Sequence, residues 1–167
     1  MQIAGAGAQA QSRHQIREDE REQIRAANRA LMVRIIHALV ACGLLATLLL
    51  SFWLKPDSRG LGTHEQIFLL PCNFYAMTGL PCPFCGTTTS FAHMARGHVW
   101  DAFLAQPMGV LGFAMCIVLL PLFAGAAISG RNLIDAIGRL PWGKLSWVLG
   151  GMILVSWLFK LTLVITH

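Results

Sequence analysis

Charged side chains are scarce in this chain. Asp, Glu, Lys and Arg make up only 13% of its 167 residues, whereas 55% are hydrophobic. Soluble domains usually carry about 25% charged residues. This deficit excludes an ordinary soluble domain and indicates that lipid surrounds much of the protein. Acidic residues accompany the basic ones near the N-terminus, so nothing in the sequence supports nucleic-acid binding.

The longest apolar runs also lack the polar stripe that a helix in a soluble bundle needs. Each run has about 20 residues, the length that crosses the hydrocarbon core of a bilayer. They cover residues 35–54, 108–129 and 145–167. No small-residue cleavage site closes the first run, so it is not typical of a secretory signal. The sequence therefore predicts an all-α integral membrane protein with three transmembrane helices in a lipid bilayer.

Lys and Arg are unevenly distributed between the segments that flank these runs. Residues 1–34, predicted to be an irregular arm up to residue 12 and then a helix, hold most of the arginines. The short loop 130–144 holds three basic residues, and so does the much longer loop 55–107. By the positive-inside rule, residues 1–34 and 130–144 are expected in the cytoplasm. Loop 55–107 is then expected on the exoplasmic side of a bacterial inner membrane.

Loop 55–107 is itself apolar and is expected to lie at the membrane interface. Thr87 or Thr88 can cap a short helix, and Gly97 stands where a glycine commonly ends one. A second short helix is expected to follow and to stop before Pro107. These signals predict short interfacial helices between the first two transmembrane helices.

His37 and Lys160 are side chains within the apolar runs that can carry a positive charge. His37 is close to the cytoplasmic end of the first run and is expected at the interface. Lys160 lies in the last turns of the third run, and its long side chain is expected to extend outward to the polar surface. Neither residue by itself predicts a functional site.

Three thiols are gathered in loop 55–107, within the segment CNFYAMTGLPCPFCG at residues 72–86. Cys82 and Cys85 have C-x-x-C spacing, and Cys72 is a third partner. Such a cluster can form a disulfide, bind a metal or exchange electrons, and all three remain open. In the redox alternative Cys82 is the nucleophile and Cys85 its partner, because a following helix N-terminus stabilises a thiolate. A second thiol pair and a βαβ pattern are both missing, so no complete catalytic set is visible and a non-enzymatic role is favoured.

The run Cys-Pro-x-Cys-Gly is also the turn of a zinc knuckle. One knuckle supplies two ligands, so a zinc site here needs Cys82, Cys85, Cys72 and a histidine. His93 is the preferred fourth ligand, because it lies on the helix that follows the knuckle. The other candidates are His64 and His98.

A resemblance follows from the order of these residues. The series Cys72, Gly79-Leu80-Pro81-Cys82-Pro83-Phe84-Cys85-Gly86-Thr87-Thr88, Gly97, Ala102 and Gln106-Pro107 resembles domain-of-unknown-function family twenty-seven fifty-two. The resemblance implies a bacterial membrane protein and names no activity. Thr88 stands where that family usually has Arg, and Gln106 where it usually has Asn.

The leading hypothesis is an accessory or assembly subunit of a larger membrane complex, with other membrane protein subunits as partners. Three short transmembrane helices bury little surface on their own, which favours such partners. The alternatives are a membrane thiol–disulfide oxidoreductase and a metal-binding membrane protein with zinc as the candidate ion.

Overall fold

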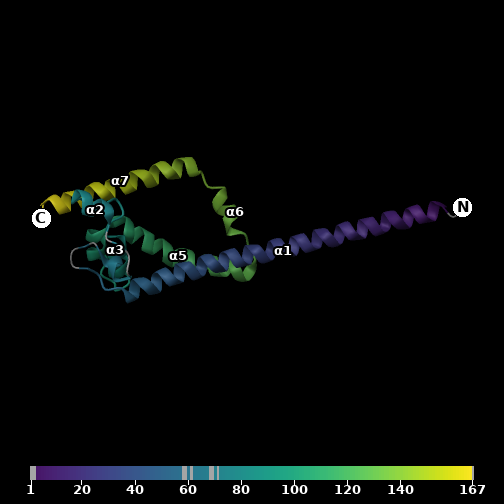
Figure 1. Cartoon of the computed structure of the whole chain (residues 1–167), viewed down its shortest axis with the longest axis horizontal. Coiled ribbons are helices and arrows are strands. Elements are labelled where there is room, and N and C mark those ends of the chain that lie inside the picture. The colour runs from purple at the N-terminus through teal and green to yellow at the C-terminus, as the bar shows by residue number, and fades with distance from the viewer. Residues whose placement is uncertain (1–2, 58–59, 61, 68–69, 71, 167) are drawn as a thin grey trace.

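The computed structural model of the protein describes residues 3–57, 60, 62–67, 70 and 72–166. Within these residues the chain is helical and has no strand, which confirms the predicted all-α class. The elements in chain order are α1 (Ile3–Trp53), the 3-10 helix η1 (Thr63–Ile67), α2 (Asn73–Thr78), α3 (Thr87–Met94), α4 (Val99–Ala105), α5 (Pro107–Ser129), α6 (Leu133–Gly138) and α7 (Trp142–Thr166). Figure 1 shows that α1, α5 and α7 are the long elements, that α2 and α3 lie together at one end of them, and that α6 lies between α5 and α7 away from that end.

In the part of the chain that the structure describes, three helices are long and apolar enough to cross a membrane. They are the later part of α1, all of α5, and α7 up to Ile165. Only 11% to 17% of the residues in their most apolar windows are buried inside the chain. The remaining apolar side chains face outward, where only lipid or another protein can keep them from water. The prediction of three membrane-crossing helices is therefore confirmed.

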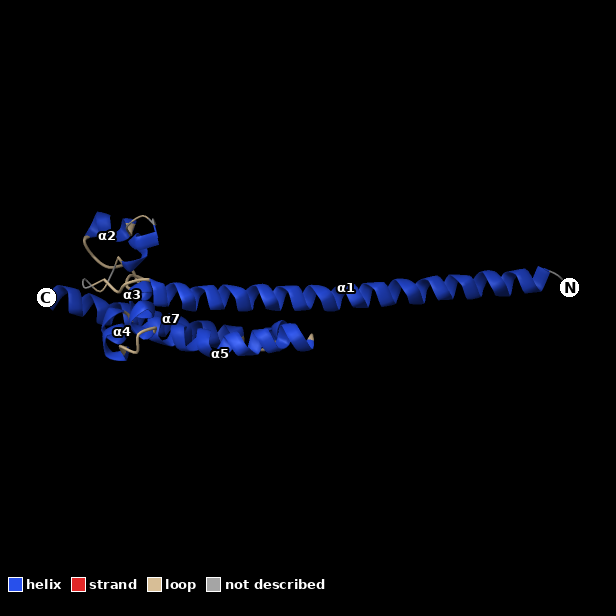
Figure 2. Cartoon of the chain, turned by 90° about the horizontal axis from the view of Figure 1, so that it is seen from below, coloured by secondary structure: helices blue, strands red, loops and turns tan. Residues whose placement is uncertain are grey.

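The first helix is longer than the sequence pattern predicts. α1 is continuous over 51 residues, which corresponds to about 75 Å at 1.5 Å per residue. It begins at Ile3, so residues 3–12, which the sequence predicts to be an irregular arm, are helical. Ala and Gln residues dominate this segment, and their high helix propensity outweighs the cost of two glycines. Figure 2 shows α1 extending far beyond the end of α5.

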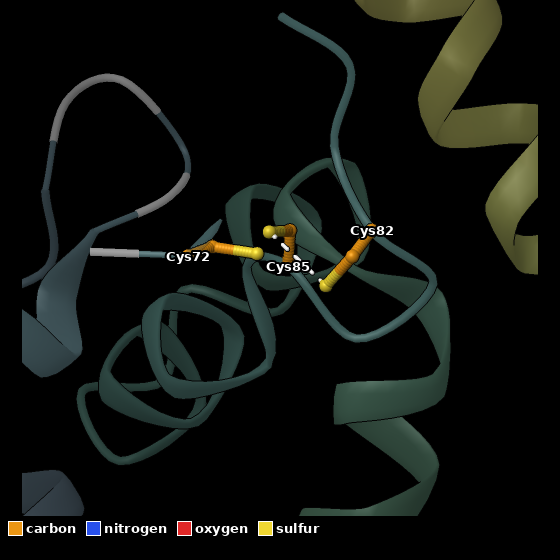
Figure 3. A group of neighbouring side chains, drawn as sticks. All are labelled: Cys72, Cys82 and Cys85. Atoms are coloured by element: carbon orange, nitrogen blue, oxygen red, sulfur yellow. Dashed lines mark hydrogen bonds between the residues drawn. The ribbon is translucent and has the colours of Figure 1, made fainter. Parts of the chain in front are cut away.

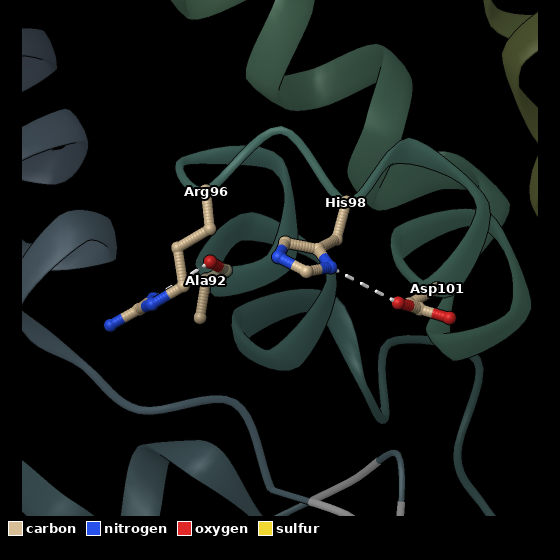
Figure 4. Close-up of polar contacts among 4 residues, drawn as sticks. All are labelled: Ala92, Arg96, His98 and Asp101. Carbon is tan, nitrogen blue, oxygen red and sulfur yellow. Dashed lines mark hydrogen bonds and ion pairs between the residues drawn. The ribbon is translucent and has the colours of Figure 1, made fainter.

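The predicted short helices are present as α3 and α4. The end of α3 is tied to the end of α1 by Arg96, whose guanidinium donates to the carbonyl of Ala92 at 2.8 Å and to that of Phe52 at 3.0 Å. Figure 4 shows Arg96 turned toward Ala92. Gly97 has a φ of 79°, so it ends α3 in the left-handed conformation that the sequence predicts. The predicted threonine cap is wrong, because the N-cap of α3 is Gly86 and makes no side-chain hydrogen bond.

Where α5 ends and α6 begins, away from the short helices α2 to α4, His37 joins α1 to α6. The residue is fully buried against other parts of the chain, and its expected position at the membrane interface stays a prediction. Its Nδ1 donates to the Val33 carbonyl at 2.6 Å, and its Nε2 accepts from the Leu133 backbone N–H at 3.1 Å. This pair of bonds requires the neutral ring with its proton on Nδ1. α5 packs along α1 far more extensively than along α7, which diverges from α5 toward α6 (Figure 1).

Candidate functional site

Cys72, Cys82 and Cys85 form a group of three thiols beside the N-terminus of α3. Their sulfur atoms all lie within 4.8 Å of one another. The Cys82 thiol donates a hydrogen bond to the sulfur of Cys85, with 3.3 Å between the two sulfurs. Figure 3 shows Cys72 approaching from a separate segment, with Cys85 between it and Cys82. Cys42 and Cys116 lie apart from this group, in α1 and α5.

A tight turn holds the C-x-x-C pair. The backbone N–H of Cys85 donates to the carbonyl of Cys82 at 3.0 Å, and the N–H of Thr87 donates to that of Phe84 at 3.2 Å. Gly86 follows with a φ of 93°, a conformation that side chains rarely adopt. A Cβ atom on Gly86 would lie 2.6 Å from the Ala105 carbonyl oxygen and 2.7 Å from that of Gly60. The glycine after the second cysteine is therefore required by both conformation and space.

Two residues from distant elements hold the prolines on either side of Cys82. Gln106, between α4 and α5, is buried and donates from Nε2 to the Pro83 carbonyl at 2.7 Å. Trp157 of α7 donates from Nε1 to the Pro81 carbonyl at 2.8 Å. The sequence gives Gln106 only as a departure from a family pattern and gives Trp157 no role. The polar edge of a tryptophan inside an apolar helix was the one available signal, because such an N–H usually finds a partner.

Lys160 of α7 also bonds to this region. Its side chain is only 5% exposed, and its Nζ donates to the Gly60 carbonyl at 3.2 Å. The expectation that Lys160 extends outward is therefore wrong, because the loop supplies a carbonyl that satisfies the ammonium group inside the protein. The same ammonium group is close enough to interact electrostatically with Cys85. The Lys160 side chain thus reaches the loop that carries the cysteines.

None of the candidate histidines has a ring nitrogen within 4.8 Å of all three sulfurs. His64, in η1, lines a cavity of about 260 Å³ together with Cys72, Cys82 and Cys85. His93 does not join the thiol group, because it lies near the other end of α3, about 9 Å along the helix from Thr87.

His93 lies instead against His98, with 6.2 Å between the ring centres. Burial lowers the pKa of His93. The Nδ1 of His98 pairs with Asp101 at 3.4 Å (Figure 4).

The electrostatic surroundings separate the thiols. The pKa of Cys72 is lowered, first by the nearby backbone N–H of Tyr75, although burial opposes this effect. The pKa of Cys85 is raised to about 12, first by burial and then by its hydrogen bond with Cys82. Cys72 therefore reaches the thiolate form more readily than Cys85. A bound metal ion would lower the pKa of Cys85 again, because a cation stabilises the thiolates that bind it.

One family model matches the central part of the chain. Residues 72–120 match the family described as "Protein of unknown function (DUF2752)". The match begins at Cys72 and ends within α5, so it contains the thiol group and Gln106 but not His64, Trp157 or Lys160. No curated protein and no solved structure matches the chain.

Proposed function

We propose that this protein is an accessory subunit of a membrane complex and that its cysteine loop is held together by a zinc ion. The ligands are Cys72, Cys82, Cys85 and His64. The observation that carries the proposal is the mutual approach of the three sulfurs to within 4.8 Å. Zn–S bonds of about 2.3 Å in a tetrahedron place the sulfurs about 3.8 Å apart, so one ion can reach all three.

The number of thiols favours a metal over a structural disulfide. One disulfide joins two cysteines and leaves the third without a covalent role, whereas a metal ion uses all three. Their donor chemistry also fits zinc, which combines thiolates with imidazole. A bound zinc ion would supply a cross-link between the segment before α2 and the turn before α3. The chain's own residues then hold the loop against the transmembrane helices.

His64 is the preferred fourth ligand because η1 is held firmly beside the thiols. The hydroxyl of Thr63 contacts that of Thr89 at 2.8 Å in the buried interior. Gln66 makes two hydrogen bonds to the backbone of Lys55, at 3.2 Å and 2.6 Å. These contacts fix η1 against α3 and the end of α1. Such support of a ligand's element is what a metal site needs to hold its geometry.

The accessory role is supported by the apolar surface that the chain leaves uncovered. The transmembrane helices bury few of their own side chains, and the cysteine end adds Met77 at 86% exposure and Trp100 at 70%. An apolar surface of this extent needs lipid or partner subunits. The role of the cysteines is then to fix the conformation of the apolar surface at the cysteine end, which binds the partner.

The proposed location is a bacterial inner membrane, with α6 and the start of α1 in the cytoplasm and the cysteine end outside. Support comes from the distribution of Lys and Arg described above. An impermeant maleimide added to intact cells should label Met77→Cys, whose side chain is exposed at the cysteine end. Mass spectrometry of the labelled peptides should find no label at position 20 of Glu20→Cys, on the exposed part of α1. The reverse pattern would overturn this orientation.

Metal analysis of the purified full chain tests the zinc proposal. Wild type should contain about one zinc ion per chain, the usual content of a single four-ligand site. Each of Cys72→Ser, Cys82→Ser and Cys85→Ser should lose it. His64→Ala should weaken zinc retention against a chelator, whereas His93→Ala, the matched control on α3, should behave as wild type. Purified wild type that takes up no zinc under reducing conditions would rule the proposal out.

A thiol–disulfide oxidoreductase is the second candidate function. The observation in its favour is the short distance of 3.3 Å between the Cys82 and Cys85 sulfurs. With Cys82 as nucleophile, Cys85→Ser should trap mixed disulfides with a partner, because the resolving thiol is absent. Cys82→Ser should trap none. Since the pKa of Cys72 is lowered, Cys72→Ser combined with Cys85→Ser is the necessary third variant: loss of trapping in this double variant would transfer the nucleophile role to Cys72.

A further inference from the structure

An apolar cavity of about 520 Å³ lies between α4, α5 and α7, in the region where α7 begins to diverge from α5. Its wall includes Phe103 of α4, Met108 of α5, and Gly151, Met152 and Phe159 of α7. Ligand sites for small molecules commonly have volumes of about 300–1,000 Å³ and mostly apolar walls with a few polar groups. This cavity is separate from the one that contains the thiols.

Ser156 supplies the polar group of this cavity. It lines the wall, is only 4% exposed, and its Oγ has no hydrogen-bond partner within the described residues. The hydroxyls of Thr47, Ser51 and Ser129 behave differently, since each donates to the carbonyl four residues earlier in its own helix. That bond is the usual way for a hydroxyl to be satisfied in a transmembrane helix. Ser156 is therefore left with an unused donor in an apolar site, which costs free energy unless a ligand accepts from it.

Aromatic rings form one wall near Ser156. The rings of Phe103 and Phe159 lie 5.5 Å apart between centres and are tilted by 55°. Phe159 is one helical turn beyond Ser156 on α7, so the rings and the hydroxyl border the same part of the cavity. A flat ring that carries a carbonyl oxygen can pack on these side chains and accept a hydrogen bond at the same time.

We propose that this cavity binds a lipid-soluble ring carbonyl compound of the quinone class. One carbonyl oxygen accepts from Ser156 Oγ, the ring packs on Phe103 and Phe159, and the apolar tail follows the groove between α5 and α7. The site is independent of the zinc proposal, because it shares no residue with the thiol group.

Pro107 and Met108, at the start of the membrane-crossing helix α5, line the same cavity as Ser156, so the hydroxyl lies close to that end of α5. A ring carbonyl is favoured over the ester carbonyl of a glycerolipid because the wall beside Ser156 is formed by two aromatic rings.

Binding of decylubiquinone to the full chain in detergent tests the proposal, with quenching of tryptophan fluorescence as the readout. Trp157 is next to Ser156 and should report occupancy. Wild type should bind saturably, and Ser156→Ala should bind about fivefold to tenfold more weakly, the weight of one neutral hydrogen bond. Ser129→Ala is the matched control and should bind as wild type. Decylbenzene, which has the tail and ring but no carbonyl, should displace the quinone only weakly.

Two adjacent glycines give a second, steric test. A Cβ at either Gly150 or Gly151 would meet no atom within 4 Å, so both positions accept a side chain without a backbone clash. Only Gly151 lines the cavity, so Gly151→Leu should abolish quinone binding and Gly150→Leu should not. Equal effects of the two substitutions, wild-type binding by Ser156→Ala, equal affinity for decylbenzene, or absence of saturable binding would each overturn the proposal. If Gly151→Leu fails to fold, Ser156→Ala, which removes one oxygen, decides the matter.

Discussion

The cysteine end and the α6 end of the helix bundle are stabilised by different polar contacts. At the cysteine end, Arg96, Gln106, Trp157 and Lys160 each donate to backbone carbonyls of another segment, so α1, α5 and α7 all meet the loop. At the α6 end, the imidazole of His37 joins α1 to α6, and α7 lies apart from α5 (Figure 1). The chain therefore concentrates its long-range polar contacts around the thiols. Because an otherwise apolar chain gathers its few polar side chains around the cysteine loop, we infer that the geometry of this loop is the most important for its function.

Removal of the metal ligands should have the largest effect and should be confined to the cysteine end. Cys85→Ser is expected to lose zinc and to expose residues 72–86 to proteases, because binding of structural zinc contributes on the order of 10 kcal/mol to the stability of small zinc domains. Limited proteolysis with mass spectrometry measures the exposure. Chelation of wild type should reproduce the same cleavage pattern. Cleavage near α6 instead would show that the ends are not separable.

Substitution of Gly86, the glycine that follows Cys85, should have the second-largest effect. Gly86→Ala combines a φ of 93° with a Cβ at 2.6 Å from a backbone oxygen, so we expect a loss of about 2–5 kcal/mol in the free energy of unfolding. Gly79→Ala is the matched control. Its φ is also positive, at 69°, but a Cβ there meets no atom within 4 Å, so about 1–2 kcal/mol is expected. Thermal unfolding measures both, and equal losses would show that the close contacts around Gly86 have no weight.

A substitution at the other end sharpens the comparison. His37→Phe keeps a ring beside Phe123, which lies 5.4 Å away, but leaves the Leu133 N–H without its acceptor. The unpaired N–H is expected to destabilise this end by about 1–3 kcal/mol, which hydrogen exchange should detect as faster exchange in α6. Zinc content and thiol reactivity should not change. A change in either would mean that the two ends are coupled through α1 or α5.

The smallest expected effect is a difference among the thiols themselves. The thiolate is the reactive form, and its fraction rises as pH approaches the pKa from below. In metal-free protein at pH 8, iodoacetamide should therefore modify Cys72, whose pKa is lowered, before Cys85, whose pKa is about 12. Labelling of Cys85 should rise only in strongly alkaline solution. Mass spectrometry of the labelled peptides gives the order, and a faster reaction at Cys85 would contradict these surroundings.

The sequence predicts the local features of this fold better than the distant contacts. Hydropathy identifies three membrane-crossing helices because a bilayer imposes length and composition on each helix separately. Gly97 and Pro107 mark the ends of α3 and α4 because both act on their own backbone. Zinc-knuckle spacing likewise predicts that Cys82 and Cys85 approach each other.

The placement of the candidate histidines could not be predicted in this way. His93 is near the cysteines along the chain, but it lies near the far end of α3, whereas His64 of η1 lines the cavity that the three cysteines line. Contacts made by Trp157 and Lys160 connect residues 76 and 100 positions apart. Such closure depends on how α7 packs after insertion, and no local pattern encodes it.

The bond from Trp157 to Pro81 also has a consequence for the order of biosynthesis. A ribosome that has just made Cys85 must add about 70 more residues before Trp157 exists, which takes roughly 4–15 s at 5–20 residues per second. During that interval the thiols are already made, but the indole and ammonium groups that close over them are not. Nascent chains arrested before α7 should therefore show the cysteines open to metal or oxidant, and arrival of the last helix should seal whatever chemical state they have reached.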